Sequence, residues 1–298
     1  MPFKFEPINF DLQKNYLKRL ASCPVQTSDY SFINLWGWAQ EYGLFWAWEE
    51  KLVWIMQTKP QRVFWSPMGN WTDIDWKDSL LNFQQEKFQF VRVPELLLEI
   101  WRNQLDDQVF FEDDRDQWDY LYSAQDLIEL KGNRFHKKKN LLNQFLKKYD
   151  YKYISFGKEM IDHVLAMQSD WCQWRDCELN DALAAENRVI EKVLNAWKKF
   201  EQISGGAIFM DEKIVAYTLA ENLTDDTLLI HFEKGNPTYQ GVYQAINQMF
   251  ISRASKEDKQ TFKMVNRMQD LGDEGLRKAK LSYNPIDFNR KFKVVLST

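Results

Sequence analysis

The stretch TLLIHFEKGNPTYQGVYQAINQMF, residues Thr227–Phe250, decides the fold of this 298-residue chain. Its alternating apolar and polar residues predict a strand over Thr227–Lys234, with Leu229, His231 and Glu233 on one face. Because the opposite face is apolar and suits a core, the face that carries His231 and Glu233 is expected to line a cleft.

The residues that follow this strand predict a turn and then a helix. Gly235-Asn236-Pro237-Thr238 ends the strand, and helical spacing from Val242 to Phe250 indicates a helix that starts near Thr238–Gly241. A strand that runs through a turn into a helix N-terminus presents free backbone N–H groups and the positive end of a helix dipole. This junction is therefore a candidate site for phosphate or another anion.

A second stretch, NRMQDLGDEGLRKAKLSYNP at Asn266–Pro285, completes this part of the chain. A strand is expected at Thr261–Val265 before it, and a short helix at Asp273–Lys280 within it. Tyr283 and Pro285 come directly after that helix. Polar residues thus follow two neighbouring predicted strands.

Composition indicates a globular protein without a strong preference for nucleic acid. The chain has 45% hydrophobic and 28% charged residues, and 298 residues are enough for two ordinary domains. Aromatic residues make up 15%, with 13 Trp, so some are expected to line clefts as well as the core. A net charge of −4 excludes a globally basic DNA-binding protein and leaves a local basic patch possible.

Cysteine usage and hydropathy predict a cytoplasmic protein. Cys23, Cys172 and Cys177 are few and odd in number, which argues against a disulfide framework and for a reducing compartment. The spacing of Cys172 and Cys177, with His163 nearby, matches no standard zinc pair, so no metal site is expected. The N-terminal residues lack a signal-peptide pattern, and no apolar run approaches the ~18–20 residues of a membrane span.

The N-terminal half predicts alternating helices and short strands. Helices are expected at Asp11–Ala21, Ser31–Tyr42, Ile74–Glu86 and from Pro94 to Trp101, and an antiparallel meander at Leu44–Glu49, Leu52–Gln57 and Val63–Ser66. Further strands are expected at Phe88–Val93 and Val109–Glu112. Tyr120–Leu130 links the halves, with Ser123 as the N-cap of a helix and Asp126 three residues later.

The C-terminal half repeats this order of elements. Helices are expected at Asn133–Tyr149, Glu159–Trp174 and from Asp181 to Trp197, and strands at Lys152–Phe156, Gly205–Met210 and Ile214–Leu219. The last two strands form a hairpin, and the strand at Thr227–Lys234 follows. The sequences of the two halves show no clear repeat.

A basic segment begins the helix at Asn133–Tyr149. Lys138 occupies a position of the apolar stripe, surrounded by Arg134, His136, Lys137 and Lys139. A lysine on such a stripe either reaches the edge of the core or meets an anion in a cleft. Two interpretations stay open: a solvated helix face, or an anion-binding patch for CoA phosphates, a tRNA acceptor stem or a lipid phosphate.

The pattern HFEKGN…YQGVYQAIN…VNRMQDLGDEGLRKAKLSYNP resembles the GNAT-related domain at the C-terminus of phosphatidylglycerol lysyltransferases, and still more the bacterial proteins built around that domain. LYSAQDLIELKGNRFHKKKN at Leu121–Asn140 and WSPMG at Trp65–Gly69 resemble the same family. The similarity covers roughly Ser28 to Phe292.

The resemblance implies an α+β fold of two tandem GNAT-like (acyl-CoA N-acyltransferase) domains, each a mostly antiparallel mixed sheet flanked by helices. The expected domains are residues 1–130 and residues 131–298, the second carrying the site. The lysyltransferases that share the domain carry membrane helices, which this chain is not expected to have.

Acyl transfer to an amine or hydroxyl needs a base, donors for the oxyanion and a hold on the carrier. Glu233 is the candidate general base and His231 could share the role, while the alternative for Glu233 is an ion pair with Lys234 or Arg267. Tyr283 resembles the tyrosine that protonates the leaving thiol in some relatives, or is a buried structural tyrosine. The catalytic candidates are thus Glu233, His231 and Tyr283.

The remaining candidates bind the carrier or the acceptor. Cofactor binding is assigned to Arg134, Lys137, Lys138, Lys139, Tyr239, Gly241, Tyr243 and Gln244. Substrate binding is assigned to Asn247, Asn266, Arg267, Asp270, Arg277 and Lys280, although Asn266 and Asp270 could instead form a polar network that holds the turn. Gly235 and Gly241 stand alone, without the Q/R-x-x-G-x-G pattern of CoA-binding relatives.

The expected function is an N-acyltransferase or aminoacyltransferase that moves a group from acyl-CoA or aminoacyl-tRNA to an amine or hydroxyl. The missing glycine pattern leaves room for aminoacyl-tRNA, the donor of the lysyltransferases and the Fem-type peptidoglycan enzymes. The alternative is a non-catalytic module that binds a small anionic metabolite, and a structural dimer partner is a third interpretation. A small-molecule or lipid-derived acceptor and possibly tRNA are the expected partners, DNA and metal are not, and the chain is expected to be a monomer or homodimer.

Overall fold

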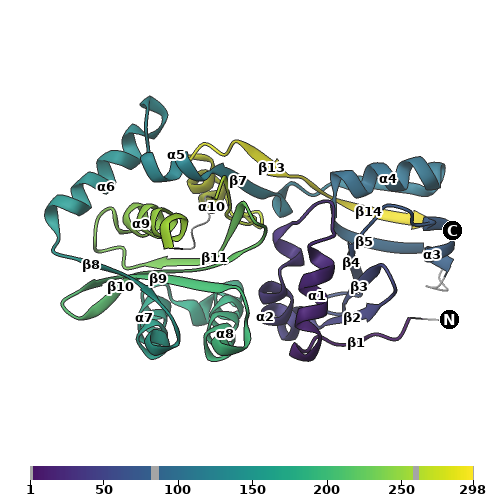
Figure 1. Cartoon of the computed structure of the whole chain (residues 1–298), viewed down its shortest axis with the longest axis horizontal. Coiled ribbons are helices and arrows are strands. Elements are labelled where there is room, and N and C mark those ends of the chain that lie inside the picture. The colour runs from purple at the N-terminus through teal and green to yellow at the C-terminus, as the bar shows by residue number, and fades with distance from the viewer. Residues whose placement is uncertain (1–2, 82–86, 258–261, 298) are drawn as a thin grey trace. The chain divides into compact units, whose positions relative to one another are not determined.

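The structure is a computed structural model that describes residues 3–81, 87–257 and 262–297. By their contacts, residues 1–119, 269–274 and 288–298 form one compact unit, and residues 120–268 and 275–287 form the other (Figure 1). Each unit is described by itself. The first unit is therefore built from three separate segments of the chain, the last of which is the C-terminal one. The division at residues 130 and 131 stays a prediction about domains.

The first unit contains a seven-stranded sheet of order β1-β2-β3-β4-β5-β14-β6. Its helices are α1 (Gln13–Leu20), α2 (Phe32–Tyr42), α3 (Trp76–Leu81) and α4 (Glu95–Leu105), with 3-10 turns η1 (Phe10–Leu12), η2 (Ser28–Tyr30), η3 (Asp106–Gln108) and η4 (Arg115–Gln117). Its strands are β1 (Glu6–Pro7), β2 (Leu44–Trp48), β3 (Leu52–Gln57), β4 (Val63–Gly69), β5 (Lys87–Pro94), β6 (Val109–Asp113) and β14 (Lys291–Ser297).

Aromatic residues fill the core of the first unit. Trp46, Trp54 and Trp101 are at most 1% exposed, and Trp54 packs edge-on against Trp76 at 6.2 Å between ring centroids. The antiparallel pairing of β2 with β3 and of β3 with β4 confirms the predicted meander. Ser31 caps α2, because its side chain accepts a hydrogen bond from the Asn34 N–H.

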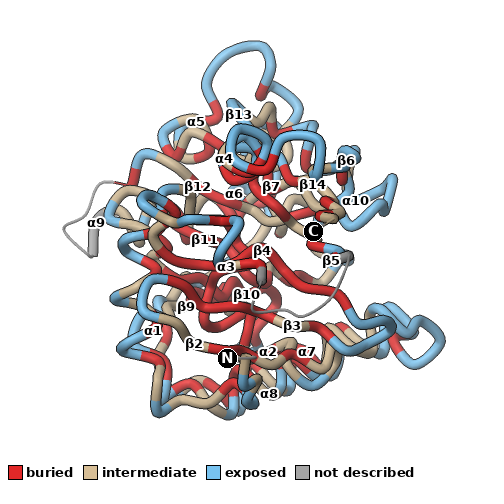
Figure 2. The backbone as a smooth tube through the Cα atoms, turned by 90° about the vertical axis from the view of Figure 1, so that its right-hand side faces the viewer, coloured by how far each residue is buried: buried red, intermediate tan, exposed pale blue. Residues whose placement is uncertain are grey.

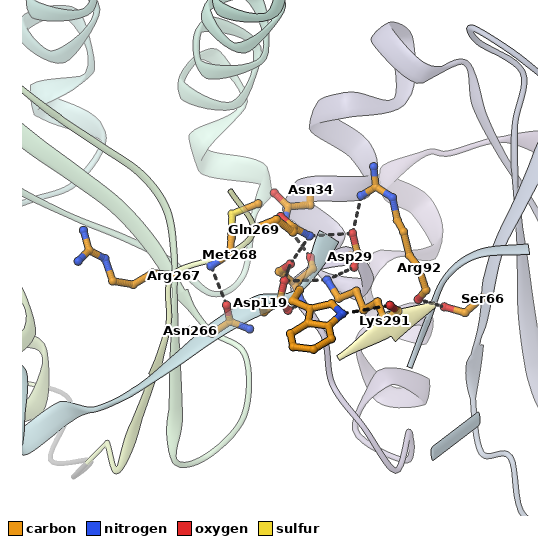
Figure 3. Close-up of polar contacts among 12 residues, drawn as sticks. Asp29, Asn34, Ser66, Arg92, Asp119, Asn266, Arg267, Met268, Gln269 and Lys291 are labelled. Atoms are coloured by element: carbon orange, nitrogen blue, oxygen red, sulfur yellow. Dashed lines mark hydrogen bonds and ion pairs between the residues drawn. The ribbon is translucent and has the colours of Figure 1, made fainter. Parts of the chain in front are cut away.

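A buried ion cluster joins the three chain segments of the first unit. Lys291 of β14 is fully buried and contacts both Asp29 and Asp119, the latter at 2.7 Å (Figure 3). Arg92 pairs with the other oxygen of Asp29, and the Gln269 side chain donates to that oxygen at 3.1 Å. Burial by itself would raise the pKa of Asp29, but the charges of Lys291 and Arg92 outweigh it and hold the pKa below its ordinary value. Two buried carboxylates are therefore balanced by two cations.

The second unit contains the other seven-stranded sheet, of order β13-β7-β12-β11-β10-β9-β8. Its strands are β7 (Asp119–Ser123), β8 (Lys152–Phe156), β9 (Ile203–Met210), β10 (Lys213–Asn222), β11 (Thr227–Gly235), β12 (Met264–Asn266) and β13 (Asp287–Asn289). By contacts, Asp119 of β7 and Phe288 and Asn289 of β13 are counted with the first unit. Its helices and 3-10 turns are α5 (Ala124–Glu129), η5 (Asn133–Phe135), α6 (His136–Lys148), η6 (Lys158–Met160), α7 (Ile161–Trp174), η7 (Cys177–Leu179), α8 (Asp181–Asn195), η8 (Trp197–Lys199), α9 (Val242–Glu257) and α10 (Glu274–Leu281).

Helices cover both faces of this sheet, with α9 on one face and α7 and α8 on the other (Figure 1). Phe145 of α6 and Val242, Ala245 and Ile246 of α9 form one core cluster with Ala216 of β10. On the other face, the Tyr217 hydroxyl donates to Gln168 of α7. Figure 2 draws β10 and β11 mostly in red, because both faces of these strands are covered.

Most predicted elements form at or near their predicted residues, with two exceptions. Strand β7 (Asp119–Ser123) occupies the start of the predicted link and the capped helix α5 follows it, so the link between the halves contributes a strand that the sequence pattern did not predict. The predicted strand at Thr261–Val265 is β12 at Met264–Asn266, and its first predicted residue lies outside the described residues. The end of the predicted helix at Ile74–Glu86 also lies outside them.

The cysteine prediction is wrong for one pair. Cys172 at the end of α7 and Cys177 in η7 form a disulfide, and Cys23 is free and buried. The turn after α7 brings residues five apart within bonding reach, with Asp176 in the left-handed backbone region. Sequence spacing does not reveal such a turn, so it pointed to separate thiols.

We expect Lys291→Met to destabilise the chain by about 3–5 kcal/mol, because it leaves the buried carboxylates of Asp29 and Asp119 with one cation fewer. Lys293→Met on the same strand is the control, since Lys293 is 41% exposed where it meets Glu112 and should cost less than about 1 kcal/mol. Urea unfolding of both variants measures the difference. Equal losses for the two variants would show that the cluster contributes no more than a surface pair.

We expect thiol titration of the denatured, unreduced chain to find one thiol and titration after reduction to find three, because Cys172 and Cys177 are bonded. In the native chain the remaining thiol should react slowly, since burial raises the pKa of Cys23 to about 11 and keeps it protonated. Three thiols before reduction would contradict the disulfide.

Candidate functional site

An irregularity in β11 decides which of its side chains meet the helices. Thr218 of β10 lies opposite Glu233, and Glu221 lies opposite Leu229. Thr218 and Glu221 are three residues apart and point to opposite faces of the sheet, so Glu233 and Leu229 do as well. The register steps from Phe232 to Ile230 between Leu219 and Ala220, which leaves one extra residue at 231.

The prediction that Leu229, His231 and Glu233 share one face is therefore wrong. The His231 ring lies with its Nε2 3.2 Å from Oε1 of Glu221, and both side chains are buried. Glu233 instead reaches α9 on the other face. A β-bulge adds a residue without interrupting the apolar pattern, so alternation counted along the sequence cannot detect it.

Glu233 is held by two donors. Asn247 of α9 donates through Nδ2 to Oε2 at 3.0 Å, and Arg267 donates through Nη2 to Oε1 at 2.9 Å. The Glu233 side chain is 9% exposed and that of Arg267 15%. Burial would lower the pKa of Arg267, but the Glu233 carboxylate outweighs it and raises that pKa. These contacts match the ion pair considered as the alternative, and the role of Glu233 as a base stays a prediction.

Tyr283 connects this ion pair to α6. Gln244 of α9 donates through Nε2 to the Tyr283 hydroxyl at 3.2 Å. The Arg267 guanidinium carbon lies 4.9 Å from the centre of the Tyr283 ring, and Lys138 Nζ lies 4.2 Å from it. Burial raises the pKa of Tyr283 despite the nearby Arg267, so its hydroxyl stays protonated at neutral pH. One aromatic ring thus contacts two cations.

The turn before α9 uses most of its own N–H groups. Asn236 accepts from the Thr238 N–H through its side chain and from the Tyr239 N–H through its carbonyl. The Gln240 N–H donates to the Tyr149 hydroxyl at 3.3 Å. The Val242 N–H donates to the carbonyl of Tyr239. Four N–H groups of this predicted anion site are therefore already bonded within the chain.

Packing against α6 explains the glycine in this turn. Gly241 has a φ of +86°, and a Cβ there would lie 2.2 Å from the Leu141 carbonyl oxygen. Tyr243 donates to the Gly235 carbonyl and accepts from the Trp171 indole, and Tyr239 packs edge-on against Tyr149. These predicted cofactor-binding residues therefore hold the turn before α9 in place against α6 and α7.

The other predicted residues lie in η5 and α6, in and after β12, and in α10. Arg134 pairs with Asp126 at 2.6 Å, Lys139 donates to the Glu129 carbonyl, and Lys137 is exposed. Lys280 is buried and donates to the carbonyls of Arg267 and Met268, which holds the chain after β12.

Asn266 accepts from the Met268 N–H within the second unit (Figure 3). Asp270 accepts from the Gly272 N–H and from Arg115 within the first unit, so Asp270 takes part in a polar network that fixes its own turn. Arg277 is half-buried on α10. Of the predicted substrate-binding residues, Asn247 and Arg267 are therefore the ones that contact Glu233.

Sequence reasoning missed two contributors. Tyr122 of β7 lies with its ring centre 5.8 Å from the Arg267 guanidinium carbon, and the alternating aromatics of Tyr120 and Tyr122 were the available signal. A hollow of about 540 Å³ beside the turn is lined by Gln144, Lys147 and Lys148 of α6 and by Gln240. The basic residues of the C-terminal end of α6 belong to no recognisable motif.

Among residues 3–81, 87–257 and 262–297, no three His, Cys, Asp or Glu side chains group in a way that could hold a metal ion. Within the same residues, no helix combines the length and the apolar character that crossing a bilayer requires.

The fold is that of two tandem GNAT-like domains, and solved structures share it. A conserved protein of unknown function from Bacteroides thetaiotaomicron is 27% identical with a TM-score of 0.90, over 99% of this chain and 100% of that one. The C-terminal domain of a putative lysylphosphatidylglycerol synthetase from Agrobacterium fabrum is 10% identical with a TM-score of 0.67, over 97% and 93%. A GNAT-family acetyltransferase from Colwellia psychrerythraea is 11% identical with a TM-score of 0.51, over 99% and 100%.

The model of the family "Phosphatidylglycerol lysyltransferase, C-terminal" matches residues 21–295. The chain therefore belongs to this family, as the resemblance at residues 227–285 indicates. An uncharacterized protein of Mycoplasmoides gallisepticum is 24% identical over 169 residues, 56% of this chain. The match spans about half the length of that curated relative, 52%.

We expect Glu233 and Arg267 to be energetically coupled. In a double-mutant cycle with Glu233→Gln and Arg267→Met, the coupling free energy should be about 1–3 kcal/mol, because each single change leaves a nearly buried partner unpaired. The exposed pair Lys263 and Asp226, 3.8 Å apart, is the control and should couple by less than about 0.5 kcal/mol. Urea unfolding measures both cycles, and strictly additive effects at Glu233 and Arg267 would contradict the ion pair.

Proposed function

We propose that the chain is an aminoacyltransferase that moves an aminoacyl group from charged tRNA to a hydroxyl or amine acceptor, with its site in the second unit. The observation that carries the proposal is the cluster of Glu233, Arg267, Tyr283 and Lys138 at the junction of β11 with α9. The family to which the chain belongs is one of acyl and aminoacyl transferases. The cluster lies at the element junction where GNAT-like domains are expected to work.

The hydrogen bonds of the turn favour charged tRNA over acyl-CoA. Pyrophosphate at a helix N-terminus needs several free N–H groups. Here the N–H groups of Thr238, Tyr239, Gln240 and Val242 are already bonded within the chain. The missing Q/R-x-x-G-x-G pattern supports the same choice.

A tRNA acceptor stem requires a basic surface, and α6 offers one. Lys137, Lys147 and Lys148 are exposed, and the last two line the hollow beside Gln240. Lysine ammonium groups along a helix suit a phosphate backbone, whose contacts depend on charge more than on sequence. Salt should therefore weaken the binding of tRNA strongly.

In the proposed reaction, the acceptor attacks the aminoacyl carbonyl and the ester bond to the tRNA ribose breaks. Tyr283 donates its proton to the leaving oxygen, since its hydroxyl is protonated and accepts from Gln244 rather than donating to it. Arg267, fixed by Glu233, supplies positive charge next to Tyr283.

A non-catalytic module that binds a small anion is the second candidate. The observation that favours it is that both oxygens of Glu233 accept hydrogen bonds in the structure, as they would in a purely structural ion pair.

The test follows label from two donors. Purified chain is incubated with bacterial tRNA charged with labelled amino acids, or with labelled acetyl-CoA, and with bacterial lipid and deproteinised small-molecule extracts as acceptors. We expect label to leave tRNA for an acceptor, and Tyr283→Phe to slow this by about 10²-fold. Tyr151→Phe, whose hydroxyl has no part in the cluster, is the matched control.

Two results would overturn the proposal. Transfer from acetyl-CoA alone would make the chain an acyl-CoA enzyme. Transfer from neither donor, with a small anion recovered from the purified chain, would establish the binding module instead.

A further inference from the structure

Lys138 is the one predicted anion-binding lysine that turns inward. It lies on the stripe of α6 that carries Leu142 and Phe145, and its side chain is half-buried. Its Nζ lies 4.2 Å from the centre of the Tyr283 ring. Within the described residues, no carboxylate or carbonyl oxygen bonds to this Nζ, which sets Lys138 apart from Lys139 and Lys280.

The charges around Lys138 disfavour a second cation. The Arg267 guanidinium carbon lies 4.9 Å from the centre of the same Tyr283 ring. Glu233, the carboxylate of β11, already accepts hydrogen bonds from Arg267 and Asn247. Besides Tyr283, Tyr122 of β7 lies near Arg267, and the residues that flank Lys138 along the chain are His136, Lys137 and Lys139. None of these brings a negative charge at neutral pH.

Burial and then the charge of Arg267 lower the pKa of Lys138. The ammonium form of Lys138 is therefore less favoured than that of a solvated lysine, and an uncharged amine is a base.

We propose that Lys138 is the acid–base group of this site, and that its amine accepts the proton of the attacking acceptor. The proposal rests on the proposed aminoacyl transfer. As the new bond from the acceptor oxygen or nitrogen to the aminoacyl carbon forms, the acceptor proton passes to Lys138 Nζ. The ester C–O bond breaks, and the leaving ribose oxygen takes the proton of Tyr283.

The cycle closes through solvent, because Lys138 Nζ lies over the face of the Tyr283 ring and not at its hydroxyl. The ammonium of Lys138 then loses its proton to solvent water and the phenolate of Tyr283 takes one from solvent water, so both groups regain their starting states without any further reactant. Glu233 fits the role less well, because its carboxylate already accepts from Arg267 and from Asn247. In this arrangement Glu233 is a positioning residue that holds Arg267.

The first test needs no activity. Trace labelling with acetic anhydride over a series of pH values, followed by peptide mass spectrometry, reports where each lysine of the native chain becomes a neutral amine. We expect Lys138 to reach half of its maximal labelling rate at a lower pH than Lys137 and Lys139, the internal references on the same helix. A midpoint equal to theirs would overturn the proposal, whatever the chain transfers.

The second test separates a base from a holder of anions. Lys138→Arg keeps the positive charge but cannot shed a proton at neutral pH, so both Lys138→Arg and Lys138→Met should slow transfer by about 10²-fold. Lys158→Met, an exposed lysine outside the cluster, is the control. Thermal unfolding confirms that the variants fold.

If Lys138→Arg transfers as fast as the wild type, Lys138 binds an anion and the proposal fails while aminoacyl transfer stands. If the wild type transfers nothing, aminoacyl transfer fails, and the labelling midpoint still decides whether Lys138 is a neutral amine.

Discussion

One extra residue in β11 determines which side chains meet in the second unit. Without the bulge at His231, Glu233 would follow the alternation of Leu229 and point toward α7 and α8, away from α9. With it, Glu233 reaches Asn247, and Arg267 after β12 can pair with it. Gln244, Tyr283 and Lys138 are then connected to that pair through short contacts. The site thus depends on a β-bulge, which turns Glu233 from one helix-covered face of the sheet to the other.

Charge compensation distinguishes the two buried polar clusters. In the first unit, Lys291 and Arg92 balance Asp29 and Asp119, so the cluster is complete by itself. In the second unit, Glu233 pairs with Arg267, and Lys138 lies beside the same Tyr283 ring without a carboxylate partner among the residues that the structure describes. A complete cluster suits a structural role. An incomplete one is suited to titrate or to interact with a substrate.

The structure also changes what the turn before α9 can do. A sequence of strand, glycine-containing turn and helix is typical of phosphate sites, but Tyr149, Asn236 and the turn's own carbonyls take up most of the N–H groups. Close packing of α6 leaves room only for glycine at position 241, and Tyr149 at the end of α6 accepts from the Gln240 N–H. The same α6 carries Lys138 inward and Lys147 and Lys148 outward, so one helix closes the turn and offers the basic surface.

The sequence by itself determined the features that depend on neighbours along the chain. The meander of β2–β4, the cap of α5 at Ser123, the inward position of Lys138 and membership of the family all follow from local periodicity, capping chemistry and motif spacing. Only the tertiary structure decided the pairing of Glu233 with Arg267, the disulfide between Cys172 and Cys177, and the place of β14 between β5 and β6. These depend on a bulge, a tight turn and a pairing of strands about 200 residues apart, for which sequence periodicity carries no signal.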